Sequence, residues 1–323
     1  MASEHIPLVD LSRTLEPGPA RDLVVETIGM ACRDIGFLII TGHGVPEPVL
    51  RNIEGTARQF FSLPQEEKMR SRTTSGFRGY APAGHDALAR SRDVRTPPDL
   101  CEFFAVNRFD DPEAARRAGL RQGRELFFSP NIWPRSPAGF RAAFEAYYAA
   151  MENLADQLIR LMALALGLEE DWFESKIREH VSNLTVNHYP ALSASVEPGQ
   201  LRRGAHSDWG SLTILYHDGA PGLQVRLPAD DWIDVPAVPG SLVVNLGDLM
   251  AAWTNDRWVS TLHRVVIPQD HHEDRFSIAF FHQPAYDALI ECLPTCTAPG
   301  NPPRHRPVTS GEWIQSMLDK TIY

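Results

Sequence analysis

Residues 204–225 read GAHSDWGSLTILYHDGAPGLQV, and this stretch indicates the fold most clearly. Its apolar runs, 212–216 and 222–225, are short, rich in β-branched and aromatic residues, and separated by Asp, Gly and Pro, as in consecutive strands joined by turns. Similar runs follow at 232–235, 241–246, 264–267 and 276–281. At least six short strands between about residues 180 and 285 predict a mainly β core, either a jelly roll or a barrel.

The first 180 residues predict mainly helices around one strand. The glycine-bounded apolar run 36–40 is typical of a buried strand, and residues 6–11 are a short extended opening. Apolar residues at threes and fours predict helices over 23–32, 49–60 and 136–166, the last beginning at Ser136-Pro137. We therefore expect a helical N-terminal region, 1–180, packed on a β core, 181–323, as one compact catalytic unit.

Two further segments complete this organisation. Residues 71–98 are rich in Gly, Pro and Arg without a period, which predicts a loop, and a final helix is expected at about 311–318. Specificity usually resides in loops added to a shared core. We therefore expect residues 71–98 and the C-terminal helix to form a lid over the substrate.

Composition excludes several classes of protein. The 323 residues are 43% hydrophobic and 22% charged, which is typical of a globular chain rather than a disordered or fibrous one. The net charge of −10 makes nucleic acid and anionic membranes poor partners. No leader or long apolar segment is evident, so a cytoplasmic protein with four reduced cysteines is expected. Residues 183–185, Asn-Leu-Thr, fit a glycosylation sequon that would have no consequence there.

Histidine and carboxylate are the residues that could carry chemistry. His206 and Asp208 are two positions apart, so on a strand both would face one side and could reach one ion, with His263 as a third ligand from another strand. Two imidazoles and one carboxylate suit non-haem Fe(II) and O2 chemistry. Spacing alone leaves surface polar residues as an equal alternative. A second His-x-Asp at 272–274 lies in a polar run and is expected to be a solvated turn.

Arg275 and Ser277 are two positions apart, on one face of a predicted strand that continues as Ile-Ala-Phe-Phe through residue 281. A buried arginine beside a hydroxyl group is suited to a bidentate grip on a carboxylate. A structural ion pair is an equal alternative from these residues alone.

Taken together, these motifs resemble the iron- and 2-oxoglutarate-dependent oxygenases of the isopenicillin N synthase type. The similarity covers nearly the whole chain and includes the segments 6–10, 31–37, 42–45, 187–190, 206–210, 222–225, 232–235, 243–248, 254–255, 260–265 and 275–277. The resemblance implies a double-stranded β-helix, a cupin-like jelly roll, with flanking helices. It also implies an enzyme that oxidises a C–H bond of a small molecule while converting 2-oxoglutarate and O2 to succinate and CO2.

The resemblance also implies roles for individual residues. Iron would be held by His206, Asp208 and His263. The cosubstrate 2-oxoglutarate would be held by Arg275, Ser277, Asn187 and Tyr189. Phe281 and Trp209 would lie at the substrate, with core packing as the alternative for both; Trp209 is a bulky residue where the family varies.

Two alternative classes of protein and the choice of reaction stay open at this point. An oxidase of the isopenicillin N synthase type shares the triad and the Arg-x-Ser pair without using 2-oxoglutarate, although Asn187 and Tyr189 favour cosubstrate use. A non-catalytic metal- or small-molecule-binding member is the second, and an intact triad speaks against it. The reaction itself could be hydroxylation, desaturation or cyclisation. A monomer or weak homo-oligomer is expected.

Overall fold

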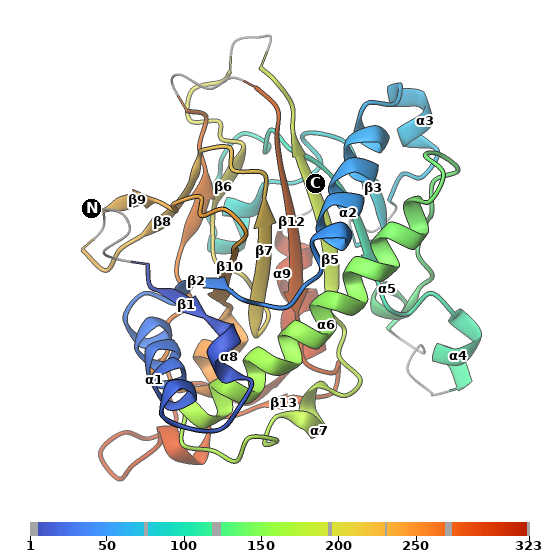
Figure 1. Cartoon of the computed structure of the whole chain (residues 1–323). Helices are drawn as coiled ribbons and strands as arrows, with labels where there is room; N and C mark the ends of the chain where they lie inside the picture. The colour runs from blue at the N-terminus through green and yellow to red at the C-terminus, as the bar shows by residue number, and fades with distance from the viewer. Residues whose placement is uncertain are drawn as a thin grey trace.

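The computed structural model describes residues 6–73, 77–117, 124–192, 196–229, 231–268 and 273–321. Its core is a large sheet facing a smaller one (Figure 1). The large sheet has the order β1 (Leu8–Asp10), β2 (Phe37–Thr41), β10 (Leu242–Leu246), β7 (Leu212–His217), β12 (Arg275–His282), β5 (Asn183–Tyr189), β4 (Glu102–Asn107), β3 (Gly79–Ala81). All neighbours in it pair antiparallel except β1 with β2. The smaller sheet has the order β6 (Arg203–His206), β11 (His263–Val265), β8 (Leu223–Arg226), β9 (Trp232–Asp234).

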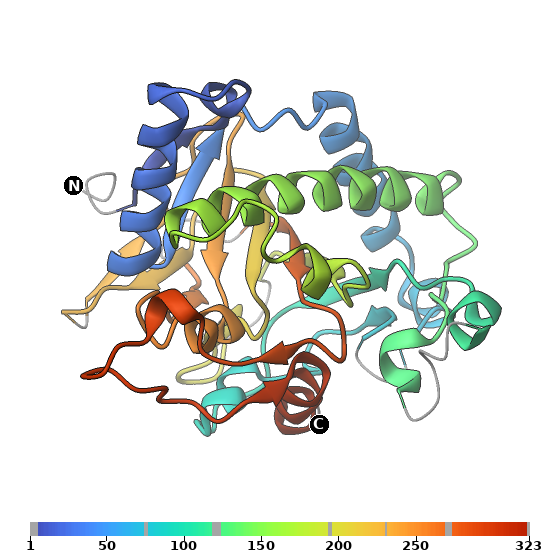
Figure 2. The ribbon, with the colours of Figure 1, turned by 90° about the horizontal axis from the view of Figure 1, so that it is seen from below.

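Three long helices cover the outer face of the large sheet. Figure 2 shows α6 (Phe140–Ala165) crossing the sheet with α1 (Pro19–Asp34) and α2 (Glu47–Phe61) beside it. The apolar side chains of α6 at threes and fours form the main hydrophobic core with the outward-facing residues of the sheet. Helix α6 begins at Phe140, four residues later than predicted, because Gly139 at φ +79° has a left-handed backbone that cannot continue a helix.

The remaining elements are short. The helices are α3 (Gln65–Met69), α4 (Pro112–Arg117), α5 (Glu125–Phe128), α7 (Glu174–Ile177), α8 (Asp248–Trp253) and α9 (Ser310–Thr321), with 3-10 turns η2 (Leu11–Thr14), η3 (Leu88–Arg92) and η4 (Pro294–Cys296). A two-stranded ribbon joins β13 (Leu289–Ile290) to β14 (Val308–Thr309). Within the described ranges, no helix has both the length and the hydrophobicity needed to cross a bilayer.

The jelly-roll core with flanking helices is confirmed, but the N-terminal half contributes more strands than expected. Strands β3 and β4 were not predicted, and with β1 and β2 they form both edges of the large sheet. Strand β3 lies within the segment 71–98, which is therefore not one irregular loop; its Tyr80 is fully buried. Residues 74–76 of this segment lie outside the described part. Strands from both predicted regions, between residues 8 and 282, lie in this one sheet.

Successive side chains of β12 and β5 face the hydrophobic core and the pocket in turn. Phe276, Ile278 and Phe280 pack outward in the main core, whereas Arg275, Ser277, Ala279 and Phe281 line a cavity between the sheets. Strand β5 repeats this arrangement, with Asn183, Thr185, Asn187 and Tyr189 on the cavity side. Since successive side chains of a strand face opposite sides, each strand supports the fold with one face and builds the site with the other.

Candidate active site

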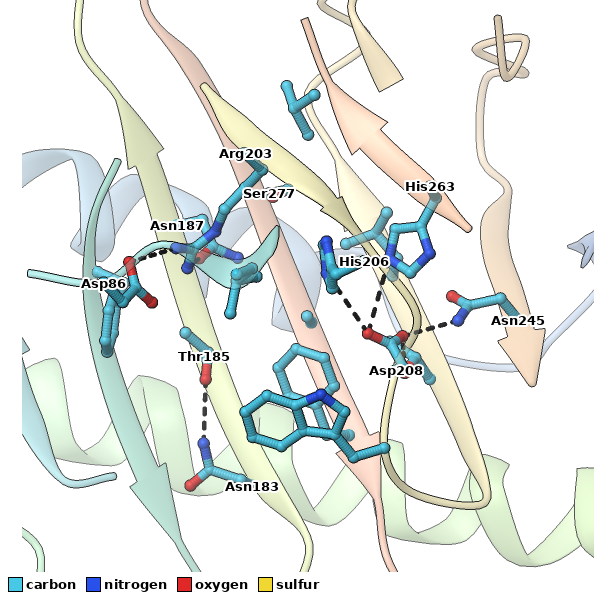
Figure 3. Close-up of a pocket in the computed structure, with 18 of the residues that line it drawn as sticks. Asp86, Asn183, Thr185, Asn187, Arg203, His206, Asp208, Asn245, His263 and Ser277 are labelled. Carbon is cyan, nitrogen blue, oxygen red and sulfur yellow. Dashed lines mark hydrogen bonds and ion pairs between the residues drawn. The ribbon is translucent and has the colours of Figure 1, made fainter. Parts of the chain in front are cut away.

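The predicted metal ligands meet at one end of this cavity. His206 is the last residue of β6 and pairs directly with His263, the first residue of β11. Asp208 lies beyond the end of β6, in the turn before β7, so the prediction that it shares a strand with His206 is wrong. The turn still brings its carboxylate beneath both imidazoles (Figure 3). One ligand atom from each residue lies within 4.8 Å of the other two.

The imidazole rings have a fixed orientation. His206 Nδ1 is 2.8 Å from the carbonyl oxygen of Gly204, and His263 Nδ1 is 3.2 Å from that of Thr261. Because a carbonyl can only accept, both Nδ1 atoms carry the proton and both Nε2 lone pairs are free. These Nε2 atoms lie 3.7 Å (His206) and 3.6 Å (His263) from Asp208 Oδ1. Burial and the neighbouring His263 lower the pKa of His206 far below its usual value, so its ring is neutral.

Asp208 is held with one oxygen facing the imidazoles. Its Oδ2 accepts hydrogen bonds from Thr213 Oγ1 and, at 2.7 Å, from Asn245 Nδ2, which leaves Oδ1 for the cluster. Burial alone would raise the pKa of Asp208, but His263, His206 and these two hydrogen bonds lower it overall. Two imidazoles and one carboxylate oxygen therefore converge in a buried site, a donor set that fits Fe(II) with open coordination positions.

A buried arginine lies elsewhere on the cavity wall. Arg275 has no solvent exposure, and its three guanidinium nitrogens make no hydrogen bond with any described residue. Its Cζ is 4.9 Å from the ring centre of Tyr189, its β5 partner. Burial raises the pKa of the Tyr189 phenol, although the Ser277 hydroxyl opposes this shift. An unpaired cation beside two hydroxyl groups fits the distal carboxylate of 2-oxoglutarate.

Asn187 on β5 lies directly opposite Ser277 on β12 and faces the same cavity. Its Oδ1 accepts a hydrogen bond of 3.0 Å from Arg203 Nη2, so the amide nitrogen is the end left for a ligand. Arg203 is itself held by Asp86, with Nη1 to Oδ1 at 2.8 Å, and lies 3.5 Å from Asp99. Burial raises the pKa of Asp99 to about 6. This cluster fixes the amide of Asn187.

Part of the remaining cavity wall is aromatic. Trp209 and Phe281, both half-buried, line it, and Trp209 also packs against the main hydrophobic core, so their contact with the substrate stays a prediction. The Nε1 atom of Trp209 is buried without a partner among the described residues. Leu88 in η3 and Leu318 in α9 close the same cavity. The structure thus brings the segment 71–98 and the C-terminal helix together at the pocket, and their action as a lid stays a prediction.

The second His-x-Asp motif is only partly described, since His272 lies outside the described residues. Asp274 is 51% exposed, accepts a hydrogen bond of 2.6 Å from the backbone nitrogen of Ala191, and lies 3.4 Å from His188 Nε2. Its carboxylate therefore has protein partners at the end of β5. In the described part of the chain, the only group of metal-ligating side chains is the triad.

Several residues of the site were missed from the sequence. Thr213 and Asn245 orient Asp208, and Arg203 and Asp86 orient Asn187. A polar residue inside the apolar run 242–246 was an available signal for Asn245, because buried polar groups need partners. Asp86 gave no such signal, since its role depends on a contact 117 residues away.

Comparison with known proteins agrees with this geometry. Residues 6–136 match the model of the non-haem dioxygenase in morphine synthesis N-terminal family, and residues 181–284 match the 2OG-Fe(II) oxygenase superfamily. The chain is 34% identical to a 2-oxoglutarate-Fe(II) type oxidoreductase of Emericella nidulans over 99% of this chain and 91% of that protein. It is 32% identical to a homoarginine-6-hydroxylase of Arabidopsis thaliana, covering 91% of this chain and 89% of the relative.

A solved structure shows the same architecture. A full-length Neurospora crassa protein in complex with alpha-KG and thymine superposes with a TM-score of 0.85 at 29% identity, covering 97% of this chain and 96% of that one. The Emericella nidulans relative is named for 2-oxoglutarate and the Neurospora crassa structure contains it, which favours the 2-oxoglutarate-dependent class over the cosubstrate-independent oxidase and the non-catalytic alternative. The chain belongs to the 2OG-Fe(II) oxygenase superfamily, of the isopenicillin N synthase type, and is an Fe(II)- and 2-oxoglutarate-dependent oxygenase acting on a small molecule.

Proposed function

We propose that His206, Asp208 and His263 hold the Fe(II), that Arg275 with Ser277 and Tyr189 holds the distal carboxylate of 2-oxoglutarate, and that the enzyme hydroxylates its substrate. The observation that carries this assignment is the fully buried, unpartnered guanidinium of Arg275 in the same cavity as the triad. An uncompensated buried charge is costly, so a bound anion explains its presence.

The protein residues orient the reactants. When bound, Fe(II) with 2-oxoglutarate activates O2 for oxidation of a C–H bond, yielding succinate and CO2. The Nδ1–H bonds to Gly204 and Thr261 keep both imidazole lone pairs aimed at the metal position. Thr213 and Asn245 keep one Asp208 oxygen facing it.

The aromatic part of the cavity wall positions the substrate. Trp209 and Phe281 present aromatic surface there, which supports contact with the substrate. Hydroxylation is preferred over desaturation or cyclisation because relatives are named as hydroxylases, of homoarginine in Arabidopsis thaliana and of proline in Petromyces alliaceus.

Iron binding and cosubstrate use can be tested together. Asp208→Ala should lose most of its iron while staying folded, since it removes the anionic ligand from a neutral imidazole pair. Exposed Asp234 provides the matched control, Asp234→Ala, which should keep full iron content. Succinate release measured with a panel of small molecules should require both iron and 2-oxoglutarate. Full iron content in Asp208→Ala, or oxidised product without 2-oxoglutarate, would contradict the assignment.

A further inference from the structure

Three side chains linked by hydrogen bonds have no part in holding iron or cosubstrate, and two of them, Asn183 and Thr185, line the cavity. Arg78 lies just before β3, and Asn183 and Thr185 lie two positions apart on β5. Both β5 residues are about 95% buried and line the cavity. They are the first and last residues of the Asn-Leu-Thr sequon. Because both side chains are buried, they act as internal polar groups and not as a glycosylation site.

Arg78 determines how the hydrogen bonds of Asn183 and Thr185 are oriented. It is 2% exposed, and its Nη1 donates to Asn183 Oδ1 at 3.2 Å while Nη2 donates to the carbonyl oxygen of Phe127 at 2.7 Å. No ion pair joins it to a carboxylate within the described ranges. Burial lowers the pKa of Arg78 to about 9, so the side chain remains a cation at neutral pH. Arg78 can therefore only donate hydrogen bonds.

The orientation of Asn183 follows from Arg78. A flipped amide would place its NH2 group against the guanidinium, donor against donor, so Oδ1 must face Arg78. Its Nδ2 then donates to Thr185 Oγ1 at 3.0 Å, the contact drawn in Figure 3. Thr185 Oγ1 accepts this bond and makes no bond as a donor to any residue that the structure describes. The hydroxyl hydrogen of Thr185 is therefore left without an acceptor in the described part of the chain.

The strand register places the Thr185 hydroxyl group in the part of the cavity proposed to hold the substrate, called here the substrate chamber. Thr185 is paired with Ala279 on β12 and Ala105 on β4, so small side chains surround it. The next inward pair on one side, Asn187 with Ser277, belongs to the proposed cosubstrate site. The next pair on the other side, Asn183 with Phe281, is adjacent to the aromatic wall.

We propose that Thr185 donates a hydrogen bond to an sp2 oxygen of the substrate, a carbonyl or carboxylate, and that Arg78 and Asn183 are positioning residues that hold its hydroxyl as a donor. This inference rests on the proposed function, because it takes the chamber beside the triad as the substrate site. A single neutral hydrogen bond of this kind changes affinity by roughly two- to tenfold.

The test uses two neutral molecules of the same shape. Acetophenone carries a carbonyl oxygen where α-methylstyrene carries a CH2 group. Their dissociation constants would be measured by ligand-observed NMR on protein loaded with Zn(II) and 2-oxoglutarate, which prevents turnover. Wild type should bind acetophenone roughly two- to tenfold more tightly than α-methylstyrene. Thr185→Val should abolish this preference, and Thr185→Ser should retain it.

A second variant tests whether Asn183 orients the Thr185 hydroxyl group as a donor. Asn183→Asp still accepts from Arg78, but its second oxygen accepts from the Thr185 hydroxyl and withdraws that hydrogen from the chamber. It should therefore lose the preference for acetophenone although Thr185 is intact. Unfolding temperatures confirm that each variant is folded.

The outcomes are separable from those of the proposed function. Equal binding of both probes to wild type, binding of neither, or a preference that survives Thr185→Val would overturn the inference. A preference that survives Asn183→Asp would overturn the positioning role of Arg78 and Asn183. Calorimetric titration with 2-oxoglutarate is run on the same protein preparations loaded with Zn(II) alone, and the probe titrations are repeated on those preparations. A protein that fails to bind 2-oxoglutarate while keeping the carbonyl preference would sink the proposed function alone.

Discussion

Replacing Arg275 by Met should stabilise the protein in the absence of cosubstrate. The guanidinium is fully buried, and none of its nitrogens is hydrogen-bonded to a described residue. A buried donor without a partner costs roughly 1–3 kcal/mol, and more when it is charged. Methionine has a similar length and fills the space without that cost. We therefore expect Arg275→Met to raise the free energy of unfolding by roughly 1–3 kcal/mol.

The same change should remove the response to cosubstrate. A ligand at one hundred times its dissociation constant stabilises a protein by about 2.7 kcal/mol. Wild type should gain this stabilisation with 2-oxoglutarate and a metal ion present. Arg275→Met should gain little because the grip on the distal carboxylate is lost.

Differential scanning calorimetry with and without 2-oxoglutarate measures both effects. The ligand-free variant should unfold a few degrees above wild type, taking roughly 2 °C per kcal/mol for a chain of this size. Arg78→Met is the matched control: Arg78 is equally buried but bonded to the oxygens of Phe77, Asn183 and Phe127, so its loss should destabilise the fold and spare the 2-oxoglutarate response. Lower stability of ligand-free Arg275→Met, or an undiminished response to 2-oxoglutarate, would refute the reasoning.

Three other substitutions have defined outcomes. Arg275→Lys keeps the charge but loses the planar fork, so the KM for 2-oxoglutarate, measured by succinate release, should rise roughly ten- to a thousandfold while iron content is unchanged. Lys68→Met breaks the buried ion pair with Glu102, in which Nζ and Oε2 are 2.8 Å apart, and should lower the free energy of unfolding in urea by roughly 3–5 kcal/mol. Phe281→Ala should weaken substrate binding but leave the calorimetric affinity for 2-oxoglutarate within about twofold, and an equal loss of both would remove Phe281 from the substrate wall.

Elements with a strong local period could be predicted from the sequence. Helices α1 and α2 and strands β7, β10 and β12 lie within one or a few residues of their predicted bounds, because an amphipathic helix or a buried strand requires apolar residues at a fixed spacing. Strand β3 could not be predicted in this way. It has three residues in a Gly-rich segment and exists because it pairs with β4. Tertiary pairing overrides weak local preference there.

The site was predictable to the extent that its residues share a motif. The spacing of His206 and Asp208 suggested one ion, and the polar run around the second motif at 272–274 separated the two, but only the resemblance raised the metal site above surface polar residues. The supporting contacts required the fold. Arg203 reaches Asp86 from another part of the chain, and Arg78 reaches Asn183 over 105 positions. Such pairs have no characteristic spacing in the sequence, because the tertiary fold brings together residues that are far apart along the chain.

The most direct test of iron and cosubstrate sharing one pocket is an anaerobic calorimetric titration of 2-oxoglutarate. It compares wild type loaded with Fe(II), wild type stripped of metal, and Asp208→Ala treated with Fe(II). The proposed site predicts one 2-oxoglutarate per chain for the iron-loaded wild type and at least tenfold weaker binding for the other two samples, since both ligands must share the cavity lined by the triad and Arg275. Equal affinity in all three samples would show that 2-oxoglutarate binds independently of the metal and would contradict the proposed site.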